Sequence, residues 1–168
     1  MDINTALLVV GNGPGALLVG KLASGRGLGS VITGHEITGG GEPEALDEVA
    51  VAILTPHGLL DVLRPYLASH HPVTITPAAF EEVVKHHCVA DMNTTVYDGL
   101  QLVEAQPTAE GGVTGVLTDG RSRWPVRADA FVDASSLPRS LSAAVAAASE
   151  LANTIVDRHI ERTRANAG

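Results

Sequence analysis

The chain has 168 residues, the length of a single domain, so we expect one folded unit over residues 1–168. Hydrophobic residues make up 45% of the chain and charged residues 18%, which is typical of a globular protein and excludes a disordered one. The formal net charge of −8 at pH 7 argues against a nucleic-acid partner, because such a partner requires clustered positive charge.

The first ten residues, MDINTALLVV, contain Asp2 and no lysine or arginine, so they lack the positive region of a signal peptide. No apolar stretch is long enough to cross a bilayer. The single cysteine, Cys88, excludes an internal disulfide and a CxxC redox pair. We therefore expect a cytoplasmic protein that has no membrane partner.

The first part of the chain predicts a strand, a helix and a second strand. Residues 5–10 (TALLVV) form an apolar run that ends in glycine, which is typical of a buried parallel strand. A helix is expected from Pro14 to Gly25, because proline is tolerated in a first helical turn and glycine ends a helix. Residues 30–33 (SVIT) form the second expected strand, which completes a β–α–β unit.

Residues 34–48 are rich in glycine and acidic residues, which predicts an exposed, mobile loop. The hydrophobic pattern then predicts a strand over 49–54, a helix over 58–69 and an extended segment over 73–75. A further helix is expected over 77–87.

The pattern changes to strict alternation after a short strand expected over 94–97. Residues 100–127 contain three alternating stretches, over 100–105, 113–118 and 122–126. They are joined by glycine-containing turns typical of tight hairpins and predict an antiparallel β-meander.

A strand over 130–133 and a long alanine-rich helix from Leu137 to about Arg164 are expected to close the fold. The apolar face of that helix favours core packing, with dimerisation as the alternative. Together the elements indicate an α/β fold: a Rossmann-like, mostly parallel sheet with an inserted antiparallel β-meander and helices on both sides.

The turn GNGPGA at residues 11–16 has the spacing of a dinucleotide-binding fingerprint. Its first glycine allows the bend after the strand, its second lets the backbone approach a diphosphate, and its third position must be small. These positions are Gly11, Gly13 and Ala16, and Gly20 keeps the same helix face small. The diphosphate would lie on the open amides at the helix start, where the helix dipole favours an anion.

The acidic second half of the fingerprint is Glu36, which follows the second predicted strand and takes the position of the carboxylate that binds the adenosine ribose. A carboxylate without an adjacent arginine favours the unphosphorylated ribose of FAD or NAD over that of NADP. The alternative interpretation is a glycine-rich structural turn that binds no nucleotide.

Several segments in this order resemble the FAD-binding domain of FAD-dependent oxidoreductases, the group of flavin monooxygenases and pyridine-nucleotide-disulfide reductases: LLVVGNGPGALLVGKL, VITGHE, PAAFEEVVKHH, the meander that leads into ADAFVDAS, and the alanine-rich helix. The first turn is often GxGPAG in that group, and GNGPGA resembles a variant with its last two residues exchanged. The resemblance implies that the turn holds the diphosphate of FAD through Gly11, Gly13, Pro14, Gly15 and Ala16. It also assigns the adenosine ribose to Glu36.

The resemblance implies a second flavin anchor at Asp133, which would bind the ribityl and phosphate part of FAD. Family members often have a Gly-Asp pair there, whereas this chain has Val132 before Asp133. Alternatively, Asp133 belongs to an earlier family segment whose final glycine is Ser136 here. Family members usually add a substrate domain, for which residues 37–76 leave little room. The 3% of aromatic residues leave few side chains to pack against an isoalloxazine ring.

The sequence therefore predicts an FAD-binding oxidoreductase or the cofactor-binding part of a flavoprotein, in which the flavin carries the chemistry. Two alternatives remain. One is a non-catalytic Rossmann-like protein that acts as a partner subunit or nucleotide-sensing module, and the other is an NAD-binding module. A protein partner or a homodimer is compatible with each of these functions.

No metal site is expected, because adjacent histidines on a helix point in different directions and no HxxxH spacing occurs. His35 is expected to be an exposed loop residue, although its place beside Glu36 makes it a candidate for function. Cys88 is expected to be a buried, inert thiol, since apolar residues follow it.

Overall fold

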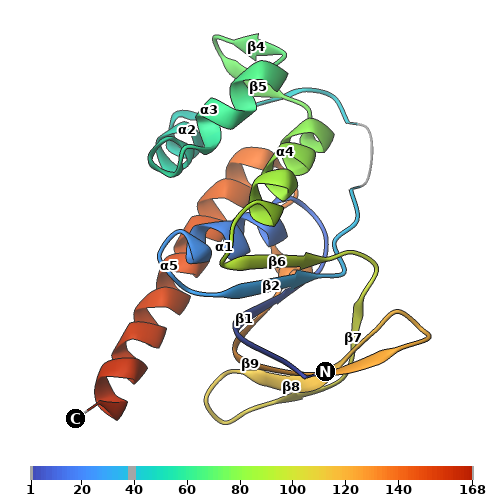
Figure 1. The fold of residues 1–168 in the computed structure, drawn as a ribbon. Coiled ribbons are helices and arrows are strands. Elements are labelled where there is room, and N and C mark those ends of the chain that lie inside the picture. The colour runs from blue at the N-terminus through green and yellow to red at the C-terminus, as the bar shows by residue number, and fades with distance from the viewer. Residues whose placement is uncertain (1, 38–40, 168) are drawn as a thin grey trace.

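The structure is a computed structural model that describes residues 2–37 and 41–167 (Figure 1). It begins with β1 (Ile3–Val10), α1 (Pro14–Ser24) and β2 (Ser30–Thr33), and the two strands are parallel neighbours. The predicted strand, helix and strand are therefore confirmed.

Six strands form one sheet in the order β6-β2-β1-β9-β8-β7. β6 (Thr94–Tyr97), β2, β1 and β9 (Arg123–Asp133) are parallel to their neighbours in this set. β7 (Gln101–Pro107) and β8 (Val113–Thr118) continue the sheet with antiparallel pairing. This is the predicted mostly parallel sheet with an antiparallel meander.

The strands predicted over 122–126 and 130–133 are one strand, β9, of 11 residues. It pairs with β8 along its first part and with β1 toward its end, so it carries the chain from the meander to the centre of the sheet. The charged residues Arg127 and Asp129, between the two predicted strands, are exposed positions in an unbroken alternation around the buried Ala128.

A small antiparallel sheet lies within residues 41–76. Its central strand β5 (Val73–Ile75) pairs with β3 (Glu44–Ala45) on one side and β4 (Ser69–His70) on the other. β3 falls inside the predicted loop of residues 34–48, of which residues 38–40 lie outside the described part of the chain.

The strand predicted over 49–54 is wrong, because this segment is the helix α2 (Glu48–Leu54). Asp47 begins the helix by accepting a hydrogen bond from the Ala50 amide at 2.7 Å. The buried positions Ala50 and Leu54 are four residues apart and share one face of the helix. A short apolar run does not by itself distinguish such a helix from a strand.

α3 (Leu59–Leu63) is shorter than the helix predicted over 58–69. Pro65 follows it, and proline has no amide to continue the helical hydrogen bonds, so the chain turns through a 3₁₀ segment. The predicted helix over 77–87 is confirmed as α4 (Pro77–Val89).

The closing helix α5 (Leu141–Asn166) begins at Leu141, whereas the sequence predicted a start at Leu137. Residue Leu137 precedes Pro138, and a residue before proline avoids the helical region; its ψ of 148° is extended. Residues 137–140 therefore form a link between β9 and α5.

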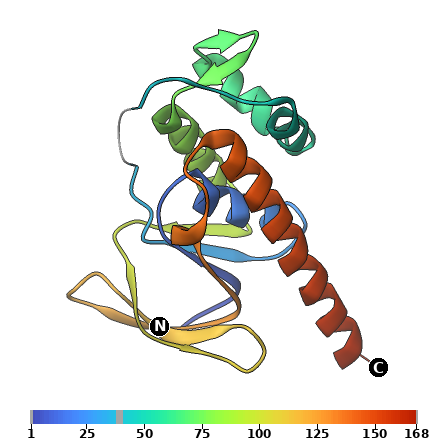
Figure 2. The ribbon, with the colours of Figure 1, turned by 180° about the vertical axis from the view of Figure 1, so that it is seen from behind.

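α1, α4 and α5 cover one face of the six-stranded sheet (Figures 1 and 2). They enclose the larger apolar core with Leu7 and Ile32 of the strands. The prediction of helices on both sides is wrong, because the second core comes from strands and turns. Its buried residues are Leu8, Val31, Leu100, Val113, Leu117, Val126 and Ala128. The meander therefore protects this face. No described helix has the length and apolar character needed to span a bilayer.

One partly buried ion pair joins α1 to the turn after α4. Lys21 pairs with Asp91, whose carboxylate also accepts from Ser24 Oγ at 3.0 Å and from the Asn93 amide at 2.9 Å. The hydrogen bond from Lys21 is the main reason that the pKa of Asp91 falls from 3.8 to about 2.

We predict that Asp91→Asn lowers the free energy of unfolding at pH 7 by about 1–2 kcal/mol. The folded pKa lies below the unfolded one, so this stabilisation is complete above pH 4 and is lost as the pH falls toward 2. Urea unfolding at several pH values measures the free energy of unfolding of the wild type and the variant. Asp157→Asn is the control, because Asp157 forms an exposed ion pair with Arg26, and an exposed pair contributes little to stability. Equal effects of the two substitutions at pH 7 would contradict the prediction.

Candidate functional site

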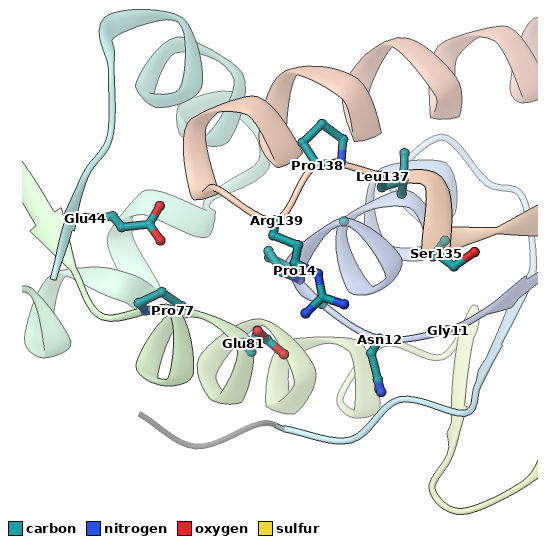
Figure 3. A pocket seen from close by; sticks show the side chains of 13 residues that line it. Gly11, Asn12, Pro14, Glu44, Pro77, Glu81, Ser135, Leu137, Pro138 and Arg139 are labelled. Atoms are coloured by element: carbon teal, nitrogen blue, oxygen red, sulfur yellow. The ribbon is translucent and has the colours of Figure 1, made fainter. Parts of the chain in front are cut away.

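A cavity of about 570 Å³ opens where β1 ends and α1 begins (Figure 3). Four parts of the chain line it: the glycine turn, the small sheet, the start of α4 and the segment 134–139 between β9 and α5. The lining residues are Gly11, Asn12, Gly13, Pro14, Gly15, Glu44, Pro77, Glu81, Ala134, Ser135, Leu137, Pro138 and Arg139. Four predicted binding residues, Gly11, Gly13, Pro14 and Gly15, are therefore brought together on one wall.

The glycine turn needs glycine at two positions. Gly11 has φ +127° and Gly13 has φ +96°, a region that residues with a side chain rarely adopt. The Gly11 amide donates to the Thr33 carbonyl at 3.0 Å, which ties the turn to the end of β2. A Cβ placed on Gly13 would meet no atom within 4 Å, so the space above this residue is open.

The N-terminus of α1 is open to a ligand. Gly13 precedes Pro14 there and supplies no side-chain cap, and the first turn carries no acidic residue. The amides of Gly15 and Ala16 have no acceptor within the helix, because they belong to its first turn. Such a helix start attracts anions through these donors and the helix dipole.

The other two long helices in the described part of the chain begin differently. The α4 start is capped by Thr76, whose Oγ1 accepts from the Ala79 amide at 3.2 Å. The α5 start is occupied by Glu44, whose Oε2 accepts from the Leu141 amide at 2.8 Å. Among the described residues, α1 is therefore the one of these three helices whose first-turn amides receive no side-chain acceptor.

Close packing explains why the start of α1 must be small. A Cβ on Gly15 would lie 2.8 Å from Leu137 Cδ1, and one on Gly20 would lie 2.6 Å from Ile32 Cδ1. Ala16, the third position of the fingerprint, is completely buried in α1 and does not line the cavity. Its role is therefore in helix packing, with its backbone amide left for a ligand.

Glu36 lies beside the glycine turn and outside the cavity lining. Its side chain is exposed, and its amide donates to Oδ1 of Asn12, the residue between the two turn glycines. The hydrogen bond brings the end of β2 against the turn. The fingerprint does not specify the residue at Asn12, so sequence reasoning missed this contact. Ribose binding by Glu36 stays a prediction.

Asp133 is not one of the residues that line the cavity. Its Oδ1 accepts from the Ser135 amide at 2.9 Å, and hydrogen bonds from Ser135 hold the pKa of Asp133 below its ordinary value. Its neighbours Ala134 and Ser135 line the cavity. The flavin contact of Asp133 stays a prediction, and its visible contact is the capping of a 3₁₀ turn.

Glu81 and Arg139 are among the cavity residues that were not identified from the sequence. Glu81 is only 4% exposed on α4, and Arg139 is an exposed residue of the link before α5. Figure 3 shows both side chains directed toward the cavity beside the glycine turn. Nothing in the local sequence distinguished Glu81 from the other acidic residues or Arg139 from the other arginines.

The prediction that His35 is exposed is wrong, since it is 1% exposed. Its ring turns inward under α4, and Nε2 lies 3.1 Å from Glu81 Oε2. Loop composition does not reveal this, because α4 comes from a distant part of the chain.

Cys88 is buried, as predicted, and Sγ lies 3.7 Å from the Leu17 carbonyl. Burial raises the pKa of this thiol to about 12, so it is an inert side chain of the core. Among the described residues, no three metal-binding side chains come together.

No protein-family model and no curated protein matches the chain, but solved structures match its fold. The flavin-dependent monooxygenase PieE, in complex with FAD and substrate, matches with a TM-score of 0.65 at 18% identity, over 77% of this chain and 30% of that one. The p-nitrophenol 4-monooxygenase PnpA from Pseudomonas putida DLL-E4 has a TM-score of 0.61 at 18% identity, over 78% and 40%.

The rebeccamycin biosynthetic enzyme RebC with reduced flavin matches with a TM-score of 0.65 at 12% identity, over 79% of this chain and 33% of that one. The chain thus spans 30–40% of the length of these three structures. At these identities the likeness shows the fold: most of the chain has a fold found in flavin-dependent monooxygenases. The fold-level resemblance to FAD-dependent oxidoreductases is confirmed.

Proposed function

We propose that this chain binds FAD and acts as an oxidoreductase or as the cofactor-binding part of a flavoprotein. The observation that carries the proposal is the cavity at the uncapped start of α1, built on a glycine turn. The flavoprotein fold of the matching structures supports FAD as the ligand and gives no support to the NAD alternative.

The residues of the turn fit a diphosphate. Gly11 and Gly13 have no side chain that would cover the backbone, and a Cβ on Gly13 would meet no protein atom within 4 Å. The amides of Gly15 and Ala16 would donate to phosphate oxygens, and Arg139 on the opposite wall adds a positive charge that no ion pair of the described residues engages. This part of the site needs no conformational change to accept an anion.

The sugar on the adenosine side would lie toward Glu36, where the exposed carboxylate can accept from ribose hydroxyls. Asn12 holds the backbone of Glu36 in place. None of the described residues that line the cavity is aromatic. We therefore assign the cavity to the diphosphate and sugar part of the ligand and not to the isoalloxazine ring.

A bound flavin would supply the redox chemistry, and the chain would bind and orient it. The uncapped amides and Arg139 fix the anionic centre of the ligand. The segment from Ala134 to Arg139 and the start of α4 enclose it on the other sides, which limits access of water.

The test is the visible absorption of the purified protein, recorded before and after incubation with FAD and removal of unbound ligand. We expect a flavin band that survives gel filtration in an equimolar amount. A colourless protein that binds ADP would indicate the alternative, a nucleotide-sensing module or partner subunit. A protein that binds neither ligand would overturn the proposal.

A further inference from the structure

The carboxylate of Glu81 is buried at the wall of the cavity, where it meets His35 but accepts no hydrogen bond from the described residues. The residue is 4% exposed, it lines the cavity, and its Oε2 makes no hydrogen bond within the described protein. An ionised carboxylate can only accept hydrogen bonds, and leaving one buried and unpaired is unfavourable. Because the side chain also lines an open cavity, a ligand there can donate a hydrogen bond to the carboxylate (Figure 3).

His35 lies against the protein side of this carboxylate. Its Nε2 is 3.1 Å from Glu81 Oε2, close enough for an ion pair with a protonated ring, although the two atoms do not have hydrogen-bond geometry. Oε2 is therefore enclosed by His35, and a ligand in the cavity would donate to the side of the carboxylate that faces the cavity (Figure 3).

Glu81 gives the cavity two chemically different ends. The start of α1 and Arg139 attract an anion, whereas the Glu81 carboxylate repels one and accepts from a neutral donor. A free phosphate or diphosphate can bind to the α1 amides and Arg139 but has no neutral donor for Glu81. A molecule that joins an anionic group to hydroxyl groups can make both interactions.

We propose that Glu81 accepts a hydrogen bond from a sugar or ribityl hydroxyl of the bound dinucleotide, and so selects it over free phosphates. The proposal rests on the proposed function for the identity of the ligand. It makes Glu81 a specificity-determining residue of the same site, from a helix that the glycine fingerprint does not include.

The test is Glu81→Gln, measured with two ligands. FAD carries both the diphosphate and the hydroxyls, and inorganic pyrophosphate carries the anion alone. FAD affinity is expected to fall by about tenfold, because a charged acceptor is lost. Pyrophosphate affinity is expected to stay the same or to rise, because a nearby negative charge is removed. Isothermal titration calorimetry gives the dissociation constant for FAD, and NMR shifts of the Gly11 and Gly13 amides give the dissociation constant for pyrophosphate.

Glu82→Gln is the matched control, because Glu82 is the next residue on α4, carries the same charge and is exposed. It should change neither constant by more than about twofold. If Glu81→Gln weakens both ligands, Glu81 only maintains the structure; if it weakens neither, the carboxylate accepts nothing from FAD. Either result overturns the inference, as does a wild-type protein that binds FAD without binding pyrophosphate. A wild-type protein that binds no FAD would instead refute the proposed function.

Discussion

Replacing Gly13 with alanine is expected to weaken FAD binding by about a hundredfold, equivalent to about 3 kcal/mol, while the protein stays folded. Gly13 has φ +96° and lies at the uncapped start of α1, with open space where a Cβ would go. The methyl group would occupy the approach of the diphosphate to the backbone. The strain of φ > 0 would also favour a change in the turn. Fluorescence titration with FAD measures the loss.

Gly27→Ala is the control for backbone strain. Gly27 has φ +87°, also has open space at the Cβ position, and lies in the exposed link between α1 and β2, away from the cavity lining. Both substitutions should lower stability by about 1–2 kcal/mol, and only that of Gly13 should affect FAD binding. Unchanged FAD affinity in Gly13→Ala would refute the assignment of the turn to the diphosphate.

Replacing Gly20 with valine is expected to lower the free energy of unfolding by about 3 kcal/mol, or the melting temperature by roughly 10 °C. The new Cβ would lie 2.6 Å from Cδ1 and 2.8 Å from Cγ1 of Ile32, a fully buried side chain of β2. Helix α1 would have to move off the sheet. Thermal and urea unfolding measure the effect.

Two further variants test the cause. Gly25→Val should change stability by less than about 0.5 kcal/mol, because Gly25 has a helical φ of −62°, is exposed and has only ordinary contacts near its Cβ position. The double variant Gly20→Val with Ile32→Ala should be more stable than the sum of the two single effects predicts. If the two single effects on the free energy of unfolding simply add, the contact with Ile32 is not the cause of the destabilisation.

The features predicted correctly from the sequence are those that depend on local patterns. The turn at Gly11 and Gly13 requires glycine for its positive φ values, and the β-meander follows from alternation and glycine turns. α4 was predicted because Pro77 and its apolar positions indicate a helix on their own. In each case one segment contains all the information.

The errors concern features that depend on tertiary contacts. The segment 49–54 was predicted as a strand, and only Asp47, just before it, indicates the helix that forms. His35 was expected to be an exposed loop residue, but packing of α4 over the end of β2 buries it against Glu81. The half of the site that lies on α4 and before α5 could not be predicted, because the glycine fingerprint describes only β1, α1 and β2.

The hydrogen bond from the Leu141 amide to Glu44 connects residues 97 positions apart and has a consequence for biosynthesis. Domains emerge from the ribosome N-terminus first, and contacts between distant residues form only after both segments are available. The glycine turn is made well before Arg139 and α5. A nascent chain has one wall of the cavity and lacks the other, so ligand capture during translation must wait until the closing helix has left the exit tunnel.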